Sequence, residues 1–397
     1  MNSSPKVSFD NIENAFAGKS KTDLNRAYLL FKAINNNMLV GMMEPLVKFS
    51  VGMHLPINSF VKATIFRQFV GGESIETCEE TINRLYHQGV GSILDYSVEG
   101  KDTEESFNNT AQEIINTIEK AKGNPKIPFC VFKVTGIASA RILEKVSSKS
   151  ILDVTDQKEW EYVSKRVNHI CETAANNNVR IFIDAEESWL QNAIDQLAEK
   201  MMEKYNKQQA IVYNTIQLYR TDRLAYLYRS FDQAKEKGFK PGVKLVRGAY
   251  MEKERERALQ KNYPSPIQPD WASTNRDYDK ALEFCIDHID DIAVCAGTHN
   301  EASSMLLVQL MEEKQIAPNH PHIWFSQLLG MSDHITYNLA KAGYNVCKYV
   351  PYGPVREVLP YLFRRAKENT SVKGQTGREL SLIIKEKERR KSGYKLN

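Results

Sequence analysis

The sequence lacks the features that identify membrane-spanning, nucleic-acid-binding and exported proteins. None of its apolar runs approaches the ~18 residues that a membrane span requires. Its net charge of +4, from 53 basic and 49 acidic residues, is too balanced to indicate nucleic-acid binding. The N-terminal stretch MNSSPKVSFDNIENAF has neither the apolar core of a secretory signal nor the acid-poor composition of a transit peptide. We therefore expect a globular cytoplasmic protein, without a targeting peptide and without nucleic acid as a partner.

Motifs for disulfide, metal and nucleotide-phosphate sites are also missing. The six cysteines form no CxxC pair, and the eight histidines show neither HExxH nor zinc-finger spacing. We expect the cysteines to be reduced thiols in the core, and we expect no metal site. No strand pattern is followed by GxGxxG, and GxxxxGK[ST] does not occur.

What the sequence does contain is a change of pattern near residue 89. Residues 1–88 carry apolar residues at helical spacing, interrupted by Pro and Gly. Eight short runs then follow, continuously apolar rather than alternating, as in strands that are covered on both faces. These runs are residues 91–97, 128–135, 179–185, 210–217, 242–249, 292–298, 322–329 and 345–352.

Helical stretches separate these runs, so the chain alternates between strand and helix. We expect helices over 102–122, 186–206, 222–238, 274–288, 300–314, 332–342 and 354–369. Such alternation predicts parallel crossovers, and eight units predict a closed, distorted (βα)8 barrel of the TIM type. An open doubly wound sheet is the alternative.

Three regions follow from this pattern. We expect an N-terminal helical region (1–88), a catalytic barrel (89–372) and a basic C-terminal tail (373–397). Within this tail, the basic stretch KEKERRKSGYKLN is interpreted first as a solvated, frayed end. The second interpretation is attraction to an anionic membrane surface.

Polar residues lie near the end of nearly every predicted strand, where barrel enzymes carry their chemistry. Each has an ordinary explanation, such as an outward-facing lysine, a helix cap or a hydrogen-bonded core histidine. Together they would be costly to bury unless they met one another or a polar ligand. We therefore expect an active site at the barrel mouth, the end of the barrel where the carboxyl ends of the strands lie. The cations in this set outnumber the carboxylates, which predicts an anionic ligand. The set is Glu99, Lys133, Asp184, Glu186, Gln217, Lys244, Arg247, Thr298, His299, Gln327, Lys348 and Tyr349.

The last expected helix (354–369) contains the stretch YLFRRAKENT and could lie across the mouth. A solvated face is the ordinary explanation of its charge run. Tyr361, Arg365 and Glu368 can share one face, however, because three- and four-residue spacings bring side chains together on a helix. Two adjacent guanidinium groups also suit bidentate recognition of a carboxylate.

Five stretches together resemble the proline dehydrogenase family, most closely its monofunctional branch. They are VKLVRGAYMEKERERA, FIDAEES, AGTHNE, FSQLLGMSD and KYVPYGPVREVLPYLFRRAKENTS. The resemblance runs from about Ala15 to Ser371. It implies a distorted (βα)8 barrel that holds FAD, oxidises L-proline to Δ1-pyrroline-5-carboxylate and passes electrons to a membrane quinone. Peripheral association with an inner membrane is a further expectation.

The same resemblance assigns roles to individual residues. It implies that Lys133, Arg364 and Arg365 hold the proline carboxylate, and that Glu99 pairs with Arg364. The walls around the proline ring are Ala249, Leu328, Tyr349 and Tyr361. The expected catalytic residues are Lys133, Asp184, Tyr349, Tyr361, Arg364 and Arg365. The expected flavin-lining residues are Asp184, Ala185, Gln217, Lys244, Val246, Gly248, Tyr250, Thr274, Thr298, His299 and Glu368.

Other functions fit the residues as well. A hydroxyproline dehydrogenase of the same family is one alternative, although Tyr349 over the ring would oppose a 4-hydroxyl group. A non-flavin barrel lyase or aldolase is another, with Lys133 as a Schiff-base lysine. A barrel that binds a carboxylate without turnover is the third.

Overall fold

Eight parallel strands close into a barrel in chain order, with β8 hydrogen-bonded to β1. The computed structural model describes residues 7–34, 62–98, 102–362 and 375–393. All eight predicted strands are confirmed, and the closed barrel is confirmed against the open sheet. The strands are β1 (Val90–Tyr96), β2 (Phe129–Lys133), β3 (Arg180–Asp184), β4 (Val212–Gln217), β5 (Gly242–Val246), β6 (Ala293–Gly297), β7 (Ile323–Leu328) and β8 (Val346–Tyr352).

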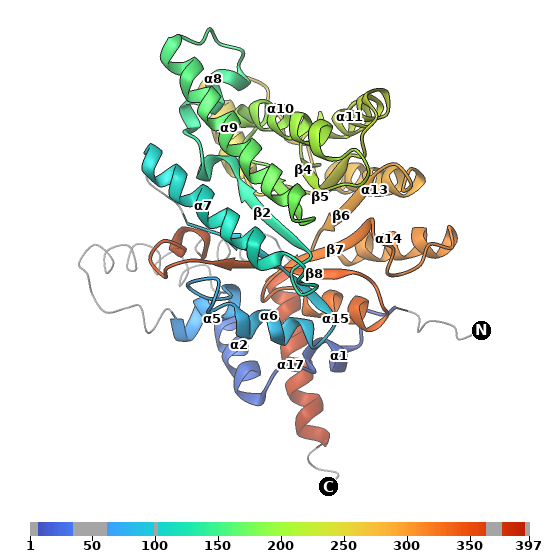
Figure 1. The fold of residues 1–397 in the computed structure, drawn as a ribbon. Helices are drawn as coiled ribbons and strands as arrows, with labels where there is room; N and C mark the ends of the chain where they lie inside the picture. The colour runs from blue at the N-terminus through green and yellow to red at the C-terminus, as the bar shows by residue number, and fades with distance from the viewer. Residues whose placement is uncertain (1–6, 35–61, 99–101, 363–374, 394–397) are drawn as a thin grey trace.

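Helices surround the strands, as Figure 1 shows. Six follow the expected ranges: α7 (Glu104–Ala121), α10 (Ser188–Tyr205), α11 (Arg223–Lys237), α13 (Trp271–Asp287), α14 (Glu301–Glu313) and α15 (Asp333–Lys341). Three more were not expected: α8 (Ala140–Ser147), α9 (Val154–Asn176) and α12 (Met251–Lys261). Ser139 caps α8, and Asp153 with Asp156 forms a capping box at α9, so local start signals were present in the sequence. No helix of the described residues is long and apolar enough to cross a membrane.

The N-terminal helices gather on the side of the barrel where β8 and α15 lie (Figure 1). They are α1 (Ile12–Phe16), α2 (Lys21–Ile34), a π-helical turn (Lys62–Phe66), α5 (Arg67–Phe69) and α6 (Glu79–Tyr86). The expected helical character of this region is therefore confirmed for its described parts.

The basic C-terminal stretch is a helix, α17 (Gln375–Gly393), and not the frayed end that its charge suggested. Leu382 and Ile383 are buried against the apolar side chains of α1 and α2. Arg390 donates to the carbonyl oxygens of Phe16 and Lys19, each at 2.9 Å, at the end of α1. The apolar face and these bonds hold the helix in place, which charge counting alone does not reveal.

The helix expected over 354–369 begins later than predicted. Residues 354–357 form turns, and helical geometry begins at residue 359, so Pro354 precedes the helix and Pro360 lies in its first turn. Tyr361 and Leu362 are buried, and Leu328 at the end of β7 packs against their cluster. Residues 363–369 lie outside the described residues.

Aromatic rings fill the barrel on the side opposite the mouth. Phe129 and Phe182 stack with their ring centroids 4.4 Å apart, and Tyr213 meets both edge-on. All six cysteines are free and buried, which confirms the expected core thiols. The interior is therefore packed up to the level of the polar residues.

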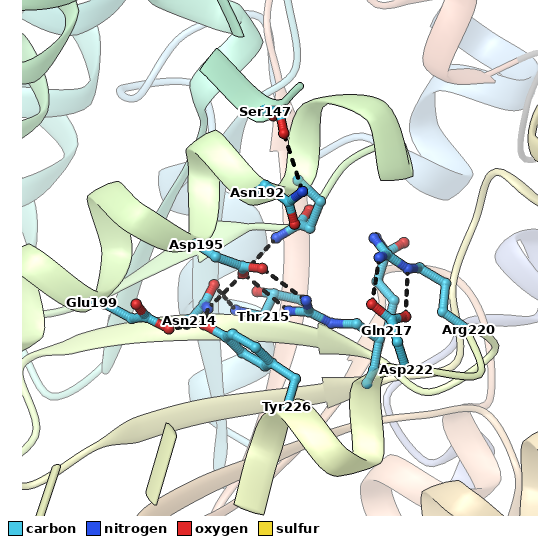
Figure 2. A network of polar contacts seen from close by, with 12 residues as sticks. Ser147, Asn192, Asp195, Glu199, Asn214, Thr215, Gln217, Arg220, Asp222 and Tyr226 are labelled. Carbon is cyan, nitrogen blue, oxygen red and sulfur yellow. Dashed lines mark hydrogen bonds and ion pairs between the residues drawn. The ribbon is translucent and has the colours of Figure 1, made fainter. Parts of the chain in front are cut away.

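A buried polar network links β4 to the helices outside it (Figure 2). Asp195 on α10 accepts two hydrogen bonds from Arg223 on α11, at 2.7 and 3.0 Å. Asn214 on β4 and Gln191 on α10 also donate to Asp195, at 2.9 and 3.0 Å. The network thus fixes α10, α11 and β4 relative to one another.

Removal of Asp195 should be strongly destabilising, because it leaves the Arg223 guanidinium buried without its counter-charge. We expect Asp195→Ala to lower the free energy of unfolding by about 3–5 kcal/mol in urea titrations. Glu161→Ala, which breaks an exposed pair with Lys165, should change it little. The double variant Asp195→Leu/Arg223→Met should recover most of the loss. Equal effects of the Asp195 and Glu161 variants would refute this account.

Candidate active site

Four charged side chains and one tyrosine meet inside the barrel, toward the carboxyl ends of its strands. They come from five strands: Asp95 (β1), Lys133 (β2), Asp184 (β3), Lys244 (β5) and Tyr349 (β8). Lys133 and Asp184 are register partners on adjacent strands. Barrel closure alone brings β8 next to β1, and so brings Tyr349 to this group.

Asp184 is shared by both lysines. Lys133 Nζ lies 3.1 and 3.3 Å from the two carboxylate oxygens of Asp95, and 3.5 Å from Asp184 Oδ2. Lys244 Nζ donates to Asp184 Oδ1 and, at 2.6 Å, to the hydroxyl of Tyr349. That hydroxyl donates in turn to Asp184 Oδ1 at 2.9 Å. The group is one continuous hydrogen-bonded cluster.

Pairing favours the charged forms of Asp184 and Lys133. Burial raises the pKa of Asp184, but Lys244 and Lys133 outweigh it, so its pKa lies below the ordinary value. Burial opposes the charged form of Lys133, yet Asp95 and Asp184 raise its pKa above the ordinary value. The pKa of Tyr349 is raised well above its ordinary value by burial and by Asp184. Lys133 is therefore a protonated cation, which argues against the Schiff-base alternative.

Glu186 joins the ends of β2 and β3. Its carboxylate accepts from the backbone N–H of Thr135 at 3.0 Å and from the Thr135 hydroxyl. Its backbone N–H donates to Gln191, and its carbonyl accepts from Gln217 at 2.6 Å. Because the side chain is buried, the pKa of Glu186 is raised to about 7. Glu186 thus fixes the loop that follows Asp184.

The rim beyond β5 exposes backbone. Gly248 has φ = +144°, and a Cβ there would come within 2.4 Å of the Tyr219 ring, so only glycine fits. Ala249 is exposed and Val246 is half-buried. A flat ligand can therefore approach the chain closely here.

Arg247 does not point into the mouth as a free cation. Its guanidinium donates to Asn275, Thr298 and Ser303 at 2.8–3.0 Å and lies over the ring of Tyr278. The cluster itself pairs two cations (Lys133, Lys244) with two carboxylates (Asp95, Asp184). The expected basic excess also counted Arg247, which is bonded to neutral groups, and Glu99, which lies outside the described residues, so the excess stays a prediction.

The other expected site residues lie around this cluster to different degrees. Gln217 and Thr298 are buried at the ends of β4 and β6, and His299 follows β6 with Nδ1 2.9 Å from the Ser332 hydroxyl. Ala185, Leu328 and Tyr250 are half-buried, and Tyr361 is buried beside Leu328. Thr274 is buried in the first turn of α13, where its hydroxyl donates to the backbone carbonyl oxygen of Asp270. Glu99, Arg364, Arg365 and Glu368 lie outside the described residues, so their roles stay predictions.

Asp95 is the member of the cluster that the sequence analysis missed. It sits in the run GSILDYS and is 4% exposed. A carboxylate inside a buried run, one residue before the strand ends, was the available signal. Lys348 was correctly noted as polar, but it pairs with Asp333 at 3.0 Å on the outside of β8 and is fully buried there.

Comparison with known proteins identifies the family. The sequence model described as proline dehydrogenase matches residues 78–378. The chain belongs to the proline dehydrogenase family. It is 32% identical to the mitochondrial proline dehydrogenase 1 of Dictyostelium discoideum, over 94% of this chain and 74% of that protein. It is 31% identical to a hydroxyproline dehydrogenase of Xenopus laevis, over 94% of this chain and 88% of that protein.

Solved structures of proline dehydrogenase relatives agree on the fold. Proline utilization A from Bdellovibrio bacteriovorus superposes with a TM-score of 0.70 at 18% identity. That match covers 91% of this chain but only 38% of the larger protein. At this identity the likeness shows the fold alone.

Glu186 should make stability depend on pH near neutrality. Since its folded pKa is above that of the unfolded chain, the native state keeps a proton that the unfolded state loses between pH 4.5 and about 7. The free energy of unfolding should therefore fall as pH rises through this window, by about 2 kcal/mol. Urea titrations at pH 5 and 8 measure it, and in Glu186→Gln this part of the fall should vanish. An unchanged pH dependence in Glu186→Gln would contradict the assignment.

Proposed function

We propose that this protein is an FAD-dependent oxidoreductase that converts L-proline to Δ1-pyrroline-5-carboxylate, the first step of proline catabolism. The observation that carries the proposal is the cluster of Lys133, Asp184, Lys244 and Tyr349 at the mouth of a barrel of this family. In this cluster, the protonated Lys133 can bind the carboxylate of proline, and the aromatic ring of Tyr349 can pack against the proline ring.

The rim fits a flavin. Gly248 and Ala249 leave exposed backbone at the end of β5, which suits the close approach of a flat ring system. Val246 offers an apolar edge, while Thr298 and His299 offer polar groups at the neighbouring strand end. Bound FAD supplies a two-electron acceptor for the hydride that leaves the substrate ring. We propose that these residues hold it, together with Gln217 and Lys244.

The chain's own side chains bind and orient the substrate. Lys133 retains 30% exposure of its side chain, so its ammonium can bind a carboxylate while Asp95 and Asp184 hold it in place. Arg364 and Arg365 are proposed to complete this carboxylate site. Positively charged groups beside the substrate also disfavour a protonated amine, and the amine must be neutral to give up a hydride from its neighbouring carbon. Fixed binding of the carboxylate then places that carbon.

Proline is favoured over hydroxyproline because Tyr349 is held rigidly. Its hydroxyl is bonded to both Asp184 and Lys244, so the ring cannot turn aside without breaking two buried hydrogen bonds. A 4-hydroxyl group on the substrate ring would compete for the same space. Relatives of both specificities are 31–32% identical, so overall similarity does not separate the two substrates.

The electron acceptor and location follow from the family and are proposed with it. We propose that a membrane quinone takes the electrons, and that the protein is cytoplasmic and associates peripherally with the inner membrane. Exposed basic residues of α17 such as Lys385 and Arg389 support contact with an anionic surface.

The spectrum of the purified protein tests cofactor and substrate together. After loading with FAD it should show a flavin band near ~450 nm. Addition of L-proline without oxygen should bleach that band, because the hydride reduces the bound cofactor. A protein that takes up no flavin, or whose band persists with proline, would refute the proposed function.

Tyr349→Ser should shift specificity toward hydroxyproline. Loss of the ring opens space for the 4-hydroxyl group and removes a wall against proline. We expect the ratio of kcat/KM for hydroxyproline over proline to rise at least about tenfold. Tyr349→Phe keeps the ring but loses the hydroxyl that holds it, so it should raise that ratio less than Tyr349→Ser does. An unchanged ratio in Tyr349→Ser would contradict the role of Tyr349 in excluding the 4-hydroxyl group.

A further inference from the structure

The C-terminal helix α17 reaches the rim of the mouth through its first turns. Glu379 Oε1 accepts a hydrogen bond of 2.5 Å from the backbone N–H of Ser332, in the turn between β7 and α15. Ser332 has φ = +50°, a left-handed conformation that non-glycine residues rarely adopt. The bond that Ser332 donates to Glu379 therefore stabilises a turn with this uncommon backbone conformation.

The same turn holds His299. The hydroxyl of Ser332 lies 2.9 Å from His299 Nδ1, and His299 follows the end of β6. A contact at one ring nitrogen fixes the orientation of the imidazole. Glu379 thus acts on His299 through one intervening residue.

A second contact joins α17 to the residues that follow His299 in the chain. Arg378 pairs with the carboxylate of Glu301, the first residue of α14, with Nη2 2.5 Å from Oε2. Glu301 also lies 2.7 Å from Nε2 of His334. Since Glu301 is two residues after His299, two adjacent residues of α17 contact both the Ser332 turn and the start of α14.

Contacts that do not involve Glu379 also dock the helix. Leu382, Ile383 and Arg390 already attach α17 to α1 and α2 (Figure 1). Glu379 is 7% exposed, and burial raises its pKa. Burying its charged carboxylate therefore costs free energy of folding. It lines a cavity of about 20 Å³ together with His299 and Ser332, which places it beside the rim.

We propose that Glu379 is a positioning residue that fixes His299 through Ser332, and that α17 is thereby part of the active-site wall. The inference rests on the proposed function, because His299 is assigned to the flavin there. Glu379 itself does not touch the cofactor or the substrate in this proposal.

Two glutamates of α17 allow a matched comparison. Glu386 is as deeply buried, but its carboxylate pairs only with Arg389 and Arg390 of its own helix among the described residues. FAD release from the holoenzyme, followed by the rise in flavin fluorescence, should be about tenfold faster in Glu379→Ala. In Glu386→Ala it should stay within about twofold, and Glu379→Gln, which keeps an acceptor oxygen, should recover most of the wild-type value. Equal effects of Glu379→Ala and Glu386→Ala would overturn the proposal.

A double variant tests whether Glu379 acts through His299. In the His299→Ala background, Glu379→Ala should cause no further acceleration of FAD release, since the group that it positions is gone. Additive effects would overturn the proposal.

Nuclear magnetic resonance of ¹⁵N-histidine-labelled protein gives a readout that does not depend on the flavin. The ring signals of His299, assigned by their loss in His299→Ala, should shift in Glu379→Ala and not in Glu386→Ala. Unshifted signals in Glu379→Ala would overturn the positioning role. A wild-type protein that binds no FAD would instead defeat the proposed function, while this measurement would still decide whether Glu379 positions the ring.

Discussion

Asp184 is the constraint on which the rest of the mouth depends. Two lysine ammonium groups and the hydroxyl of Tyr349 meet at this single carboxylate. A charge in a barrel interior costs several kcal/mol unless it is paired, so each of these side chains requires the others. The cluster spans five strands and exists only when the barrel is closed in its observed register.

A second layer of buried polar residues holds the loops around this cluster. Gln191 connects the Asp195–Arg223 pair to the backbone of Glu186, two residues beyond Asp184. On the opposite rim, Glu379 of α17 holds the turn that contacts His299. Both supports come from helices outside the barrel, so the barrel and its covering helices share the task of shaping one site.

Much of the fold was predictable because buried strands and helices have characteristic apolar patterns in the sequence. Eight continuous apolar runs, all but the second followed by an expected helix, indicated the barrel, and the polar residues near their ends indicated the mouth. The prediction failed where the local signal was weak or contradictory. Arg247 was counted as a free mouth cation because its partners Asn275 and Ser303 are distant in sequence. The charge of KEKERRKSGYKLN favours a frayed end, but the short apolar face formed by Leu382 and Ile383 lies just before that stretch and docks the helix.

The sequence by itself determined the class of fold, the strand ends that carry polar groups and the family to which the chain belongs. These depend on residue type and on spacing along the chain, which are local properties. Only the tertiary structure decided which charges pair: that Lys133 meets Asp95, that Tyr349 bonds Asp184, and that Glu379 supports Ser332. Such pairs join residues from 38 to 165 positions apart. No spacing rule reaches that far, because the distance between them is set by barrel closure and helix docking.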